Sequence, residues 1–311
     1  MKGMNSKKVN WMYIVMFVTF LAVSYGLSWY VTHVGPVSVY PLYLINELVF
    51  LIPVILFVLC SGSRFRELLN FRKIKLSTAF MTILFAFLCM PIASVCNLFS
   101  MFFVENTVGA SSGVVMQMPF AVAFLLIAVY APVCEEIIFR GVTYESLKNG
   151  QNVFQAMLVS AVLFGLAHMN FNQAAYAIVL GVILVLLKEA TGSLWATILF
   201  HVVFNGYNVV LMYAQEGIGE SASSRLTETM TQIEYRDFLL QGISVYMVIA
   251  MVTTALAGCV LAWIAGNENR KEQLKNIWCK RKENKGKVFR IPFFIVLILY
   301  IGMMLLDAFA I

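Results

Sequence analysis

Two glutamates and an arginine, Glu135-Glu136-x-x-x-Arg140, interrupt an apolar segment and could carry acid–base chemistry. Adjacent residues on a helix point about 100° apart, so the two carboxylates cannot share one face. Glu136 and Arg140 have the i, i+4 order that favours an ion pair. Glu135 is left without an obvious local cation, which suits it to work as a general base. The alternative for Glu136 and Arg140 is a structural salt bridge at a helix end.

Two further motifs follow along the chain, Phe164-x-x-x-His168 and His201-x-x-x-Asn205. The members of each motif share a helix face, because residues i and i+4 are neighbours there. His201 and Asn205 can each donate a hydrogen bond, and two convergent donors could stabilise an oxyanion. Standing alone, His168 could instead be an interfacial side chain. The His201–Asn205 pair could likewise be a polar contact between helices.

The elements that must position these motifs are membrane-spanning helices. The chain has 311 residues, of which 61% are hydrophobic and only 12% are charged. Soluble domains carry about 25% charged residues, so a soluble globular protein is excluded. A spanning helix needs about 20 apolar residues. The candidates are Trp11–Tyr30, Tyr40–Cys60, Thr78–Val104, Pro119–Phe139, Val153–His168, Ala174–Leu187, Leu194–Tyr213, Ile243–Gly266 and Ile291–Ile311.

Charge alternates between the loops and predicts the orientation. Lys and Arg concentrate in cytoplasmic loops. The basic N-terminal tail and the basic loop 267–290 are therefore expected in the cytoplasm, with Lys188 in a cytoplasmic turn and the polar loop 214–240 outside. The net charge of +6 then reflects topology. Attraction of the 267–290 loop to anionic lipids is favoured over a nucleic-acid partner.

Several features indicate one membrane domain over residues 1–311. No internal repeat is visible, and the first apolar run is too long for a cleaved signal peptide. The six cysteines fall mostly inside spans, without metal-ligand spacing, and are interpreted as small apolar residues. The sequence thus predicts an all-α helix bundle of eight or nine spans with a cytoplasmic N-terminus.

Helix geometry indicates that the motifs can meet. If the first motif's helix continues to a turn at Asn149-Gly150, Glu135 lies about 21 Å before that turn. His168 lies about 24 Å along the next helix, so the two residues are expected at nearly equal depth. His201 and Asn205 match this depth less well and require a tilted helix. Pro132 is expected to kink or break the first motif's helix.

In this order and on membrane helices, the three motifs resemble the CAAX-protease and bacteriocin-processing (CPBP, or Abi) family of intramembrane endopeptidases. The resemblance covers residues 119–213, the expected catalytic core. It implies that Glu135 activates a water with help from His168, and that His201 and Asn205 form an oxyanion hole. Glu136, Arg140 and Phe164 would then support these residues.

The resemblance implies no cofactor, although two His and two Glu side chains could in principle bind zinc. His-Glu-x-x-His, a common zinc-protease motif, is absent. A ninth span and the long 214–240 loop, a possible lid or partner surface, depart from the family pattern. Glu47 is a further intramembrane carboxylate without a family role, either structural or lining a cavity. A carboxylate at mid-membrane costs about 2.5–3.5 kcal/mol on insertion scales.

The leading hypothesis is an intramembrane endopeptidase of a bacterial plasma membrane. Its expected partners are the lipid bilayer and a membrane-associated substrate: a bacteriocin, a leader or a signalling peptide. One alternative is a non-catalytic immunity protein that binds a partner, and another is a metal-dependent membrane protease. A transporter is disfavoured, because matching broken helices and repeated halves are absent from the sequence.

Overall fold

The computed structural model describes residues 4–217, 230–283 and 289–309, and these residues contain helices but no strand. Eight helices in this part of the chain are long and apolar enough to cross a membrane. An all-α, multi-pass membrane fold is therefore confirmed. The spans are α1 (Ser6–His33), α2 (Val39–Ser61), α4 (Leu76–Ser100), the composite helix Phe120–Lys148, α11 (Phe171–Thr191), α12 (Leu194–Gly217), α14 (Gln232–Asn267) and α16 (Ile291–Phe309).

The composite helix carries the Glu135-Glu136 motif and changes its winding along its length. It consists of α7 (Phe120–Ala123), η1 (Phe124–Tyr130), α8 (Ala131–Glu136), η2 (Ile137–Thr143) and α9 (Tyr144–Lys148), where η marks π-helix. The remaining short helices are α3 (Phe65–Leu69), α5 (Thr107–Ala110), α6 (Ser112–Val115), α10 (Val153–Ala167) and α15 (Lys271–Cys279).

The fifth predicted span, Val153–His168, is a shorter helix than the other spans. Its helix, α10, has 15 residues, which is about 22 Å of helix against a hydrocarbon core of about 30 Å. It begins at an Asn152 cap, whose Oδ1 accepts from the backbone N–H of Gln155 at 2.8 Å. It packs closely on α11, because a Cβ on Gly181 would lie only 2.7 Å from Cα of Ala161. The short helix is thus held inside the bundle by a neighbouring span.

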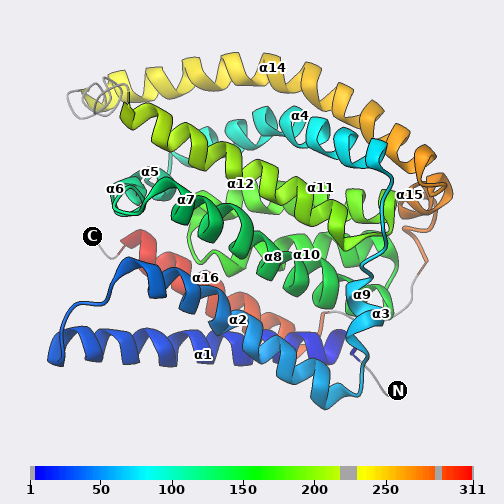
Figure 1. Ribbon diagram of the computed structural model, residues 1–311, viewed down its shortest axis with the longest axis horizontal. Coiled ribbons are helices and arrows are strands. Elements are labelled where there is room, and N and C mark those ends of the chain that lie inside the picture. Colours follow the sequence, from blue (N-terminus) through cyan, green and yellow to red (C-terminus); the bar gives the residue numbers. More distant parts are fainter. Residues whose placement is uncertain (1–3, 218–229, 284–288, 310–311) are drawn as a thin grey trace.

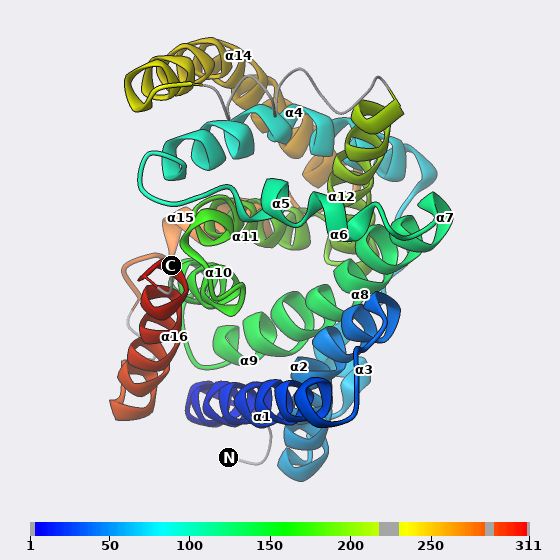
Figure 2. The ribbon, with the colours of Figure 1, turned by 90° about the vertical axis from the view of Figure 1, so that its left-hand side faces the viewer.

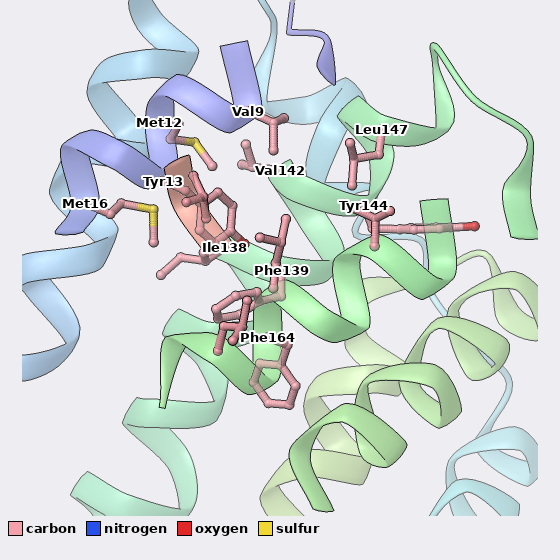
Figure 3. Close-up of a cluster of buried hydrophobic side chains, with 14 of the residues drawn as sticks. Val9, Met12, Tyr13, Met16, Ile138, Phe139, Val142, Tyr144, Leu147 and Phe164 are labelled. Carbon is pink, nitrogen blue, oxygen red and sulfur yellow. The ribbon is translucent and has the colours of Figure 1, made fainter. Parts of the chain in front are cut away.

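The helices run roughly alongside one another, with α1, α2 and α16 on one side and α4 and α14 on the other (Figure 1). The motif-bearing helices lie between these two groups, as the perpendicular view also shows (Figure 2). One apolar cluster joins α1, η2, α10 and α16, and it includes Tyr13, Phe139 and Phe164 (Figure 3). A second joins α4, α11, α12 and α14 through residues such as Phe200. The three motifs therefore lie where the two clusters meet.

Buried ion pairs fasten the helix ends that lie at one end of the bundle, where Figure 1 shows α3, α9 and α15. Glu189 contacts Lys148, and its Oε2 lies 3.8 Å from Arg270. Lys188 was predicted to lie in a turn but belongs to α11, where it is buried and lies 3.9 Å from Glu145. α11 ends instead at Gly192, whose φ of 67° is in the left-handed region.

Both predicted long loops contain helix. α14 begins at Gln232, so the polar 214–240 segment is only partly a loop, and its residues 218–229 lie outside the described part of the chain. The helix starts with a capping box between Thr231 and Glu234. The basic 267–290 segment contains the amphipathic α15, and its residues 284–288 are also outside the described part.

Candidate active site

Glu136 and Arg140 form the ion pair that their spacing predicts. Arg140 Nη1 lies 2.8 Å from Glu136 Oε1, and both side chains are buried. The guanidinium carbon also lies 4.1 Å from the centre of the Phe164 ring, a cation–π contact. Arg140 therefore pairs with Glu136 and not with Glu135.

The helix that carries this motif runs on through Pro132, so of the predicted kink or break the break is wrong. Pro132 has no backbone N–H, and it lies two residues after the end of the π-helical segment η1 at Tyr130. The wider winding is visible where the N–H of Ala131 bonds to the carbonyl of Leu126, five residues earlier. A second π-helical segment, η2, follows Glu136. Such segments occur often at functional sites, and these two set the direction of the carboxylates between them.

His201 lies between the two carboxylates of the first motif. Its Nδ1 is 2.9 Å from Glu136 Oε1, and its Nε2 is 3.4 Å from Glu135 Oε2. The depth mismatch expected from the sequence is thus absent in the folded protein. Because the ion-paired Glu136 can only accept a hydrogen bond, Nδ1 of His201 carries a proton. Nε2 is then free to face Glu135.

His168, the C-cap residue of α10, is also oriented through its Nδ1 atom. This atom lies 2.9 Å from the carbonyl oxygen of Phe164, which can only accept. Nε2 is therefore the nitrogen available for chemistry. The Phe164 ring packs edge-on against both imidazoles, with centroid distances of 5.0 Å to His168 and 6.0 Å to His201. Phe164 thus spaces the two histidines, a supporting role that its buried position favours.

Asn205 lies one turn beyond His201 on α12. Its Nδ2 donates to the carbonyl oxygen of Ile127, in η1, at 3.2 Å. An amide nitrogen has two hydrogens, so one donor remains. The structure places His201 and Asn205 on one wall, while their convergence on an oxyanion stays a prediction.

A cavity of about 380 Å³ brings the candidate residues together. Glu135, His168, His201 and Asn205 all line it. The Glu135 side chain is 19% exposed, whereas Glu136 is fully buried behind it. The cavity volume is within the usual range for small-molecule sites. Its other described lining residues are Phe20, Tyr43, Asn46, Glu47, Phe50, Ile127, Ala131, Ile138, Phe139, Phe164, Ala167, Met169, Gln173, Tyr176, Ala177, Leu180 and Phe204.

The cavity also includes Glu47 of α2, to which sequence reasoning assigned no role. The sequence feature that pointed to this residue was a lone carboxylate within an apolar span. The structure supports the cavity-lining alternative over a purely structural side chain. Nothing in the sequence indicated that α2 packs against the motif helix, where Tyr130 donates to the Leu44 carbonyl at 3.2 Å.

A zinc centre needs three or four protein ligands held close together. Among the described residues, no group of three or more His, Cys, Asp or Glu side chains is arranged to hold a metal ion. One His201 nitrogen and one Glu136 oxygen are already engaged with each other. The side chains present therefore do not fit a preformed zinc site.

Comparisons with known proteins agree with the motifs. Residues 117–207 match the family described as Type II CAAX prenyl endopeptidase Rce1-like. "Putative membrane peptidase YdiL" from Bacillus subtilis (strain 168) is 29% identical over 107 residues. That alignment covers 34% of this chain and 43% of the relative, so the chain spans less than half of the relative's length. No solved structure matches the chain. The matched segment contains all three motifs, and it is similar to the Rce1-like CAAX prenyl endopeptidases.

Proposed function

We propose that the protein is an intramembrane endopeptidase that hydrolyses a peptide bond in a membrane-associated peptide or protein. The observation that carries this proposal is the setting of Glu135. Its carboxylate faces the cavity, lies 3.4 Å from Nε2 of His201, and is not paired with Arg140, which Glu136 occupies. A carboxylate so placed is suited to take a proton from a water molecule.

The reaction divides among the residues that line the cavity. A water molecule attacks the carbonyl carbon of the substrate peptide while Glu135 accepts one of its protons. The carbonyl oxygen becomes an oxyanion in the tetrahedral intermediate. When the carbon–nitrogen bond breaks, Glu135 returns the proton to the leaving nitrogen, which gives a carboxylic acid and an amine. His168, through its Nε2 atom, positions the attacking water.

His201 and Asn205 are the proposed oxyanion donors. Since the Nδ1–H of His201 is committed to Glu136, its Nε2 can donate only when the ring is an imidazolium. The adjacent Glu136 carboxylate stabilises that cation. Asn205 supplies the amide hydrogen that is not bonded to Ile127. Removal of one such donor from other hydrolases costs about 10²–10³ in kcat.

The setting we propose is a bacterial plasma membrane with a cytoplasmic N-terminus. The end of the bundle with α3, α9 and α15 carries Arg66, Lys148 and Lys275, whereas the 106–118 segment has no Lys or Arg. Basic residues favour the cytoplasmic side. The Bacillus subtilis relative supports a bacterial context. Bacteriocins, leader peptides and signalling peptides are the proposed substrates, with processing or immunity as the outcome.

The test is cleavage of a peptide library by the protein reconstituted in lipid vesicles. Glu135→Gln preserves the shape of the side chain and is expected to lower kcat/KM by about 10²–10⁴, the usual contribution of a general base. Asp307→Asn is the matched control, because Asp307 is an exposed carboxylate on α16 that does not line the cavity. Cleavage by Glu135→Gln at the wild-type rate would overturn the assignment. Tight peptide binding without cleavage by the wild type would favour a non-catalytic immunity protein.

A further inference from the structure

One face of α2 forms a wall of the catalytic cavity. Tyr43, Asn46, Glu47 and Phe50 all line it, and their i, i+3, i+4, i+7 spacing places them on one stripe of the helix. Glu47 is the acidic member of this stripe. Glu135 lines the same cavity from α8, which packs against α2.

Glu47 differs from the other buried acids in its lack of a cationic partner. Its side chain accepts a hydrogen bond from Asn46 Nδ2 at 3.2 Å, and among the described residues no Lys, Arg or His lies within ion-pair distance. The residue is only 7% exposed. By contrast, Glu136 pairs with Arg140, and Glu268 lies 3.5 Å from Arg72. Every other buried glutamate in the described part of the chain thus contacts a Lys or Arg side chain, whereas Glu47 faces the cavity.

The position of Glu47 makes this lack of a partner informative. The residue lies about 12 Å from the start of α2, well inside the span. Ionisable groups at such depth are unfavourable unless they are paired, and they usually mark a functional pathway. Since the described lining residues include no Lys or Arg, a cation that pairs with Glu47 would come from a molecule that enters the cavity.

The shape of the wall indicates which kind of cation fits. Phe20 and Phe50 stack with a centroid distance of 5.9 Å beside Glu47, and both line the cavity. Apolar rings suit the hydrocarbon stem of a long side chain, whose charged end then reaches a carboxylate. Asn46 and Tyr43 add neutral oxygen atoms that can accept from an ammonium or guanidinium group.

We propose that Tyr43, Asn46, Glu47 and Phe50 form a subsite that accepts a lysine or arginine side chain of the substrate, close to the bond that is cleaved. This specificity rests on the proposed function. The ligand enters extended along α2, so that its cation pairs with Glu47 while its backbone lies against Glu135. The protein then selects substrates with a basic residue near the cleavage site.

The test measures binding, so that it does not depend on turnover. The probes are fluorescent, Leu/Ala-rich peptides with a single lysine at successive positions, each matched by a peptide with norleucine at that position. Norleucine keeps the hydrocarbon stem and removes the charge. The binding measurements use the Glu135→Gln protein in detergent. When the lysine stands at one or two of the tested peptide positions, the lysine peptide is expected to bind about tenfold tighter than its norleucine match, a difference of about 1.4 kcal/mol. The added substitution Glu47→Gln is expected to bring the ratio of the two affinities to about one.

Two further variants make the result decisive. Glu47→Asp keeps the charge and should retain part of the preference for lysine, whereas Asp307→Asn should retain all of it. Equal affinities for the lysine and norleucine peptides at every position, or a preference that survives Glu47→Gln, would overturn the subsite. A failure of the proposed protease activity would instead appear as peptide binding without any cleavage by the wild-type protein, and the two failures are thus distinguishable.

Discussion

The Nδ1 atom of His201 lies 2.9 Å from Oε1 of Glu136, the same oxygen that Arg140 contacts at 2.8 Å. One carboxylate oxygen therefore joins the first motif to the third. Because Glu136 is fully buried behind Glu135, it does not reach the cavity itself. Its contribution is to fix the His201 ring and to balance the charge of Arg140.

Replacement of Glu136 by methionine is expected to destabilise the protein by about 3–5 kcal/mol, because Arg140 would be left as an unpaired buried charge. The double variant Glu136→Met/Arg140→Met is expected to recover most of that stability, since both charges are then gone. Activity should stay low in both variants, because His201 has lost its acceptor. Thermal unfolding in detergent and kcat/KM together separate these effects.

An exposed ion pair provides the control for this experiment. Arg64 and Glu67 lie 3.6 Å apart, with side chains 83% and 68% exposed. Glu67→Met should therefore change stability by only about 0–1 kcal/mol. A double Met variant of the buried pair with wild-type activity would contradict the role assigned to Glu136.

His168 provides a prediction about which nitrogen acts. Since Nδ1 donates to the Phe164 carbonyl, the useful atom is Nε2. Asparagine can replace the Nδ1 contact but reaches no further, whereas glutamine places a polar group near the position of Nε2. His168→Asn is expected to lower kcat/KM by about 10²–10⁴, and His168→Gln by less. If His168→Gln lowered kcat/KM more than His168→Asn while both variants had the same thermal stability, His168 would act through Nδ1.

Much of the site was predictable because it depends on local spacing. The Glu136–Arg140 pair follows from the i, i+4 geometry of a helix, whatever surrounds it. The common depth of Glu135 and His168 follows from helix rise and the turn near Asn149. Hydropathy likewise predicts most spans, because the bilayer requires a minimum length of apolar helix.

The features that were missed depend on contacts between distant segments. The helix continues through Pro132 with π-helical winding before it. A proline that breaks a helix leaves the same pattern in the sequence, so the sequence could not distinguish the two outcomes. The place of Glu47 in the cavity depends on how α2 packs on the composite helix, which no local pattern encodes.

The contact between α10 and α11 should be sensitive to a single methyl group. A Cβ on Gly181 would lie 2.7 Å from the backbone Cα of Ala161, so Gly181→Ala must push α10 away. We expect a loss of stability of about 1–3 kcal/mol, typical of overpacking, and lower activity because α10 carries Phe164 and His168. Gly258→Ala is the matched control, since no described atom beyond its chain neighbours and its own helix backbone lies within 4 Å of the position that a methyl group would take there on α14. Equal unfolding temperatures for the two variants would contradict the close packing.

Chelation tests whether the water is activated by Glu135 alone. Because no three His, Cys, Asp or Glu side chains of the described residues are arranged to hold a metal ion, peptide cleavage is expected to survive both EDTA and 1,10-phenanthroline. The measurement is the initial rate in lipid vesicles, with a zinc metalloprotease in the same vesicles as the control for chelator access. Loss of activity that micromolar Zn²⁺ restores would contradict this prediction. In that case Glu135, His168 and His201 would be the side chains to test as ligands, since their free oxygen and nitrogen atoms face one cavity.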